Sequence, residues 1–133
     1  MYMSHLLSRS LAIAAILALS SGLASAIEKR HFWLSDTVDL FELCTTPIDD
    51  PLRPQAINYC MAYLDGAVDY HDAISDHKEM ERLICYPETA SLEEGVLVFI
   101  AWAQANQSDK KLMDEPTVIG VVRALEAKWP CDQ

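Results

Sequence analysis

Four cysteines are the residues best suited to covalent chemistry in this 133-residue chain: Cys44, Cys60, Cys85 and Cys131. Zinc sites in small domains use closely spaced pairs such as C-x-x-C, whereas these cysteines are separated by 16, 25 and 46 residues. An even number of cysteines in a small exported domain instead predicts two disulfides in an oxidising compartment. Bridged thiols cannot ionise, so a cysteine nucleophile activated by a histidine is not expected.

A second polar group, made of His71, Asp72, Asp76 and His77, contains residue types that bind metals. Consecutive residues of a helix point about 100° apart, and His77 falls near or beyond the expected helix end. His71 also lies on the apolar side, so a packed histidine beside an acidic edge is favoured over a metal site. The sequence contains no nucleophile elbow, Gly-rich phosphate loop, H-E-x-x-H or C-x-x-C-H motif. We therefore expect neither an enzyme nor a bound cofactor.

Asp65, Asp69, Asp72 and Asp76 follow one another at i, i+4, i+7 and i+11, which places them along one side of a helix. We call this set the acidic ridge. The ordinary interpretation is a side that faces water. The alternative is a docking surface for a basic partner, whose association such charge would accelerate.

The first 26 residues have the pattern of a secretory signal peptide. Arg9 precedes an apolar stretch, and Ala24-Ser25-Ala26 supplies the small residues that a signal peptidase recognises, so cleavage is expected after Ala26. The apolar stretch is shorter than the ~20 residues needed to span a bilayer, which argues against an uncleaved anchor. The sequence thus predicts a periplasmic protein with one domain at residues 27–133.

The charge of the exported domain is strongly negative. Without Arg9 it holds 20 acidic and 9 basic residues, a net charge of −11. Nucleic acid and anionic membrane surfaces are poor partners for such a protein. The charge favours a basic protein partner, although solubility alone would also account for it.

Four segments have helical periodicity and no strand pattern appears, so we expect an all-α fold, a small four- to five-helix bundle. The first helix is expected over residues 35–44, capped by Ser35 or Asp36. The longest is expected over residues 54–75. Gly66, at its middle, is expected to permit close packing by a neighbouring element.

The third helix is expected over residues 91–106, opening on a capping box in which Ser91 and Glu94 satisfy each other's backbone N–H groups. Residues 95–105 are apolar nearly all round the helix, which indicates that it is covered on every side. The core or a second subunit would provide that cover. A homodimer through residues 95–105 is therefore expected.

The last helix is expected to have Asp114 or Glu115 as its cap and Pro116 in its first turn. Its predicted inner face consists of Val118, Val122, Leu125 and Trp129. A further short helical turn is expected around residues 80–84.

The order of the helices favours one disulfide pairing among the three that four cysteines allow. If the first two helices form an antiparallel hairpin, Cys44 lies beside Cys60. If the last two do the same, Cys131 returns beside Cys85. Bridges Cys44–Cys60 and Cys85–Cys131 satisfy both hairpins, and each would stabilise the fold by about 3–4 kcal/mol.

Short motifs surround the cysteines in a recognisable order: Leu43-Cys44, then C-x-x-Y-L-x-G from Cys60, C-x-P from Cys85, and W-P-C from Trp129. In these motifs the chain resembles the Rap/Tai family of immunity proteins of type VI secretion systems, over essentially all of residues 27–133. The resemblance implies a periplasmic, all-helical, commonly dimeric protein that binds and inhibits a secreted peptidoglycan amidase with a Cys-His active site.

The resemblance also implies that recognition lies in the connection between the last two long helices. The corresponding residues here are Gln107, Ser108, Asp109, Lys110, Lys111, Asp114 and Glu115. Charge reversal at Asp109, Asp114 and Glu115 together is expected to weaken inhibition. The acidic ridge is the second candidate surface.

Two other classes of protein stay open. One is a periplasmic acid-stress chaperone, against which the presence of four rather than two cysteines argues. The other is a small structural subunit of an envelope complex.

Overall fold

The computed structural model describes residues 26–77 and 80–131, so residues 1–25 of the predicted signal peptide lie outside the described residues. The described chain forms a 3-10 helix and five α-helices, which confirms the all-α prediction. They are η1 (Lys29–Trp33), α1 (Thr37–Cys44), α2 (Arg53–Ser75), α3 (Leu92–Asn106), α4 (Lys110–Met113) and α5 (Thr117–Lys128).

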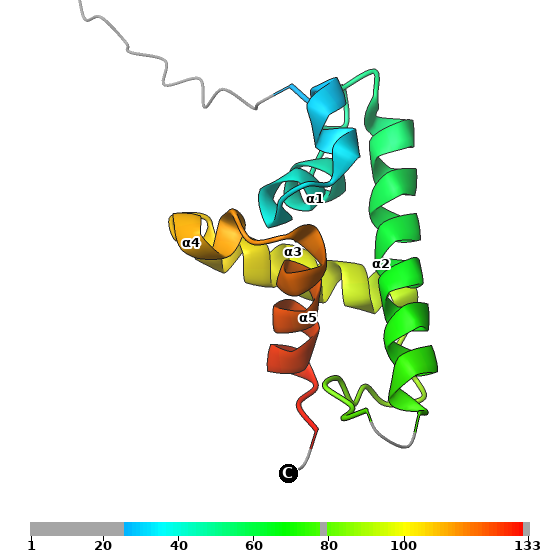
Figure 1. Ribbon diagram of the computed structural model, residues 1–133. Helices are drawn as coiled ribbons and strands as arrows, with labels where there is room; N and C mark the ends of the chain where they lie inside the picture. The colour runs from blue at the N-terminus through cyan, green and yellow to red at the C-terminus, as the bar shows by residue number, and fades with distance from the viewer. Residues whose placement is uncertain (1–25, 78–79, 132–133) are drawn as a thin grey trace, which may run out of the picture.

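The long helices are arranged around α3. In Figure 1, α2 runs the height of the molecule, α3 lies crosswise to it, and α5 packs on α3. Together η1 and α1 cover one end, where α1 contacts α2, α3 and α5. The four long helices therefore share one core, whose fully buried side chains include Leu40, Leu43, Leu64, Phe99 and Leu125. Burial of each such side chain stabilises the fold by about 1.5–3 kcal/mol.

Both predicted disulfides are present. Cys44–Cys60 joins the end of α1 to the first turns of α2, with the Cα atoms 5.1 Å apart. Cys85–Cys131, with its Cα atoms 4.9 Å apart, joins the segment before α3 to the chain after α5. There the backbone N–H of Cys85 also donates to the carbonyl of Trp129 at 2.9 Å.

The start and inner face of α5 differ from the prediction. Its N-cap is Pro116, rather than Asp114 or Glu115. Val118, expected in the core, is 43% exposed, and the buried side consists of Thr117, Gly120, Val121, Ala124 and Leu125. The reason is the contact with α1, because a Cβ at Gly120 would overlap the side chain of Thr37. A small residue in α5 is needed for that close approach.

The core covers only one side of α3 in the described part of the chain, so the expected second subunit stays a prediction. Val96, Phe99 and Ala103 are buried, but Leu97 is 65% exposed. The helix therefore has an uncovered apolar side. Its predicted cap is confirmed in part, since the Ser91 hydroxyl accepts from the Glu94 N–H at 3.1 Å while the Glu94 side chain is exposed.

Two further predictions are corrected. A Cβ at Gly66 would meet nothing within 4 Å, so this glycine serves no close packing within the described fold. Residues 80–84 are not helical, and Ile84 instead forms an isolated antiparallel bridge with Pro130. By contrast, the charged connection at residues 107–115 contains a helical turn, α4.

Candidate functional site

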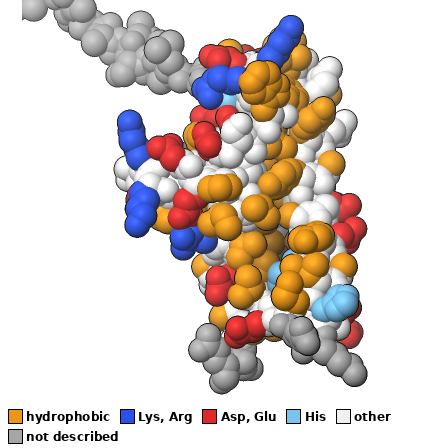
Figure 2. Space-filling model, viewed as in Figure 1, with side chains coloured by type: hydrophobic (Ala, Val, Ile, Leu, Met, Phe, Trp, Pro, Cys, Tyr) orange, Lys and Arg blue, Asp and Glu red, His pale blue; other side chains and the backbone are white. Residues whose placement is uncertain are grey.

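The predicted recognition residues gather around α4, at the turn between α3 and α5 (Figure 1). The Asp109 carboxylate caps α4 by accepting from the N–H groups of Lys111 and Leu112, at 3.0 and 3.3 Å. The Met113 side chain, 4% exposed, anchors the turn in the core. Figure 2 shows basic and acidic side chains next to one another at this end of the molecule.

Glu115 is held within the protein. Its carboxylate forms a bidentate pair with the Arg123 guanidinium, at 2.6 and 2.8 Å, and the hydrogen bond from Arg123 is the main cause that lowers the pKa of Glu115. Its carbonyl accepts from the N–H and the hydroxyl of Thr37, at 2.9 and 3.0 Å. Glu115 thus supports the turn. The exposed members of the predicted set are Gln107, Ser108, Asp109, Lys110, Lys111 and Asp114.

The acidic ridge divides into exposed and bonded residues. Asp65, Asp69 and Asp76 are exposed along α2, and Figure 2 shows acidic side chains at this edge of the molecule. Asp72 is half-buried and bonded on three sides. It lies 3.0 Å from the Nδ1 atom of His71 and 3.4 Å from Arg82, and it accepts a hydrogen bond from the Tyr86 hydroxyl.

His71 is buried, as its place on the apolar side predicted. Its Nε2 atom accepts from the N–H groups of Leu83 and Ile84, at 3.3 and 3.2 Å, so its Nδ1 atom carries the proton and donates to Asp72. The expected divergence of the His71 and Asp72 side chains is wrong, because rotation beyond the Cβ atoms brings the two groups together. The described residues include no group of three or more possible metal ligands.

The pKa values of Asp72 and Tyr86 move in opposite directions. Burial alone would raise the pKa of Asp72, but the hydrogen bonds from Tyr86 and His71 and the charge of Arg82 together lower it. Burial, followed by the bond to the negative Asp72, raises the pKa of Tyr86 to about 12. Both shifts favour a neutral phenol bonded to a carboxylate, a structural contact that fixes the segment before α3 on α2.

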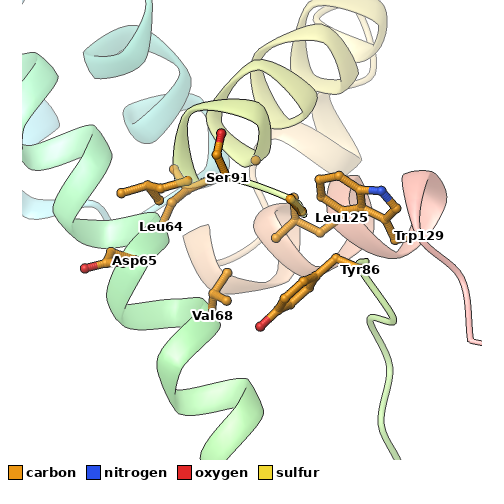
Figure 3. A pocket seen from close by; sticks show the side chains of 10 residues that line it. Leu64, Asp65, Val68, Tyr86, Ser91, Leu125 and Trp129 are labelled. Carbon is orange, nitrogen blue, oxygen red and sulfur yellow. The ribbon is translucent and has the colours of Figure 1, made fainter. Parts of the chain in front are cut away.

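A pocket of about 170 Å³ lies beside this contact, between α2, α3 and α5 (Figure 3). Its lining is mainly apolar, and the Tyr86 and Trp129 rings meet edge to face with centroids 6.3 Å apart. The lining residues are Leu64, Asp65, Val68, Tyr86, Ala90, Ser91, Leu92, Gly95, Leu125 and Trp129. Nothing in the sequence predicted this pocket, although Tyr86 and Trp129 belong to the C-x-P and W-P-C motifs whose cysteines form the second disulfide.

The fold and these surfaces define a small, disulfide-linked helical domain with two candidate binding surfaces, at α4 and along α2. The chain belongs to the family of Rap1a immunity proteins, which it matches over residues 36–131, from the cap of α1 to the last cysteine. It is therefore an immunity protein directed against a secreted effector. No curated protein and no solved structure matched in the same comparisons. Within the described ranges, no helix combines the length and apolar character required to cross a membrane.

Proposed function

We propose that this protein resides in the periplasm and binds and inhibits a peptidoglycan amidase delivered by a type VI secretion system. The observation that carries the proposal is the family match over residues 36–131. The two disulfides support an oxidising compartment. The predicted signal peptide provides the export route. Inhibition protects the producing cell and its kin from the amidase.

Inhibition by steric block needs a surface that is ordered before it meets the enzyme. The turn at α4 is held at three points: the Asp109 cap, the buried Met113, and Glu115 bonded to Arg123 and Thr37. Such fixation reduces the entropy lost on binding. The exposed Lys110, Lys111 and Asp114 then provide the charged contacts that orient the two proteins.

A challenge assay tests the proposal. The reading frames next to this one are first searched for a small Cys-His hydrolase. That hydrolase is expressed in the periplasm of a host, with or without this protein, and survival is measured together with binding of the two purified proteins. Wild type should form a stoichiometric complex and restore growth. Absence of a complex, or capture of many unfolded proteins at low pH in place of one enzyme, contradicts the proposal and supports the chaperone alternative.

The variant that tests the α4 surface is Lys110→Glu/Lys111→Glu/Asp114→Lys. It avoids Asp109 and Glu115, because reversal at these two residues would remove a helix cap and an ion pair and so disturb the turn itself. The matched control, Lys29→Glu, lies on η1 and changes the net charge by the same amount. We expect loss of inhibition only for the triple variant, with an unchanged helical signal for both proteins.

We also propose that two copies associate through the exposed side of α3. Leu97 and Ala101 are exposed there, beside the half-buried Trp102, and a shallow apolar hollow continues to Ala127 on α5. Covering these side chains with a second copy would remove apolar surface from water. Leu97→Glu should convert a dimer into a monomer in sedimentation equilibrium, whereas a wild-type monomer at all concentrations contradicts the dimer.

A further inference from the structure

The pocket between α2, α3 and α5 is separate from the α4 turn. Figure 3 shows Val68 of α2 directed into it, with Leu125 of α5 and the ring of Trp129 on the far side. Its volume is about 170 Å³. An apolar cavity of ~150 Å³ holds a benzene ring, so this pocket has room for one aromatic or branched aliphatic side chain.

The wall of the pocket is fixed before any ligand binds. Tyr86 packs edge to face on Trp129, and its hydroxyl donates to Asp72 of α2. The Cys85 N–H donates to the Trp129 carbonyl at 2.9 Å, and the Cys85–Cys131 disulfide joins the residue before Tyr86 to the second residue after Trp129. A ligand therefore meets a formed cavity and does not have to order its lining.

Two acidic residues of α2 lie at or beside the pocket. Asp65 belongs to the lining, and Figure 3 shows its carboxylate directed away from the cavity. Asp69, one turn further along α2, is also exposed and lies near enough to Tyr86 to contribute to the raised pKa of that phenol. Within residues 26–77 and 80–131, neither Asp65 nor Asp69 takes part in an ion pair, whereas Asp72 is paired with Arg82. Two carboxylates thus stand free to bind a cation beside the apolar cavity.

We infer that the pocket binds one apolar side chain of a protein partner, and that a Lys or Arg adjacent to that side chain pairs with Asp65 and Asp69. A buried anchor with charged contacts at its edge is the common arrangement of binding hot spots. The partner is a basic segment of the effector, and in this respect the inference rests on the proposed function. The contact is a second one, independent of the α4 turn.

A peptide titration tests the pocket without the effector. The disulfide-bonded exported protein is titrated by NMR with acetyl-Lys-Lys-Phe-Lys-Lys-amide, with the Phe→Ala peptide, and with a peptide in which Glu replaces every Lys. We expect the first peptide to shift the signals of Val68, Gly95 and the Trp129 indole. The other two should bind at least about tenfold more weakly, because each lacks one half of the contact.

Two variants fill the pocket without altering charge. Val68→Phe places a ring in the cavity and should weaken binding of the Phe peptide by at least about tenfold. Gly95→Ala adds one methyl group, which would meet only Leu125 at 4.0 Å, so it leaves the fold intact and should weaken binding less. The matched control is Ala73→Phe, at an exposed position of the same helix.

A separate pair of variants tests the charged contact. Asp65→Asn/Asp69→Asn should remove the salt dependence of peptide binding, whereas Asp49→Asn should not.

Three results overturn the inference: peptide shifts confined to α4, equal binding of the Phe and Ala peptides, or unchanged binding by Val68→Phe. Shifts of the same pocket signals on raising the protein concentration alone identify a second copy of this chain as the occupant, which also overturns it. Binding of the effector is measured separately. An effector that binds wild type and Val68→Phe equally contradicts the pocket contact and leaves the proposed function intact, whereas an effector that binds neither contradicts the proposed function.

Discussion

The Nε2 atom of His71 accepts a hydrogen bond from the backbone N–H of Ile84, which lies 13 residues further along the chain, at 3.2 Å. The N–H of Leu83 donates to the same nitrogen at 3.3 Å. Ile84 is buried, so its N–H has little access to water. One histidine side chain therefore fixes the non-helical segment that leads to Cys85 and the pocket.

Replacing this histidine should loosen that segment. His71→Phe keeps an apolar ring but leaves the Leu83 and Ile84 N–H groups without their acceptor, so we expect the free energy of unfolding to fall by about 2–4 kcal/mol. Urea denaturation measures the loss, and hydrogen exchange at these two amides should accelerate. His77→Phe, at an exposed position, is the control and should be nearly neutral. Equal stability of the two variants would contradict the structural role of His71.

The sequence predicted the helices well where periodicity and proline placement agree. The expected helix over residues 54–75 is α2, because its apolar spacing is unbroken and Pro54 suits a first turn. The cysteine pairing followed from the helix order alone. The inner face of α5 was predicted only in part: Leu125 is buried as expected, but Thr117 and Gly120 are not apolar, and their burial arises from contact with α1. Periodicity cannot report a close approach between two helices distant in the sequence.

The candidate surfaces were predictable only in part. Charge and position indicated α4 and the acidic ridge, but the structure shows that Glu115 and Asp72 bond within the protein. Both contacts join residues eight or more positions apart and depend on how the segments meet in space. The pocket depends on the same kind of contact, since Tyr86 reaches it from a segment without periodicity.

Two glycines should respond in opposite ways to replacement by alanine. In Gly120→Ala the added methyl group overlaps Thr37, so we expect destabilisation by about 1–3 kcal/mol, despite the higher helix propensity of alanine. In Gly66→Ala nothing lies within 4 Å of the new atom, so the propensity gain of about 0.5–1 kcal/mol should appear as added stability. Thermal unfolding of the two variants and wild type measures both effects. A stabilised Gly120→Ala would contradict the close approach of α1 and α5.

The two disulfides should differ in what their loss does to the pocket. Chain-entropy reasoning gives about 3 kcal/mol for Cys44–Cys60 and about 4 kcal/mol for Cys85–Cys131, because the second closes the longer loop. We therefore expect the Cys85→Ser/Cys131→Ser variant to unfold at the lower urea concentration. It alone should also broaden the NMR signal of the Trp129 indole, since Cys44–Cys60 lies at the other end of α2. Equal broadening in Cys44→Ser/Cys60→Ser would contradict a local effect on the pocket.

The contact between Tyr86 and Asp72 should make stability depend on pH at both ends of the scale. The pKa of Asp72 is lowered in the folded protein, so its stabilisation is present above the unfolded value of 3.8 and is lost as the pH falls through the folded value. The pKa of Tyr86 is raised from 10.0 to about 12, so its stabilisation is complete below pH 10 and is lost as the pH rises toward 12.

Tyr86→Phe should remove the effect at high pH and weaken the effect at low pH, because it deletes the phenol and one of the two hydrogen bonds that lower the pKa of Asp72. The difference in unfolding free energy between wild type and this variant should be constant from about pH 5 to 9 and should shrink outside that range. Urea denaturation at a series of pH values measures it, and the tyrosinate absorbance of folded wild type should show one phenol ionising near pH 12. The control is Tyr70→Phe, at a position 67% exposed. Its unfolding free energy, plotted against pH, should run parallel to that of wild type over the whole range. A parallel curve for Tyr86→Phe would mean that the phenol does not bond to Asp72 in solution.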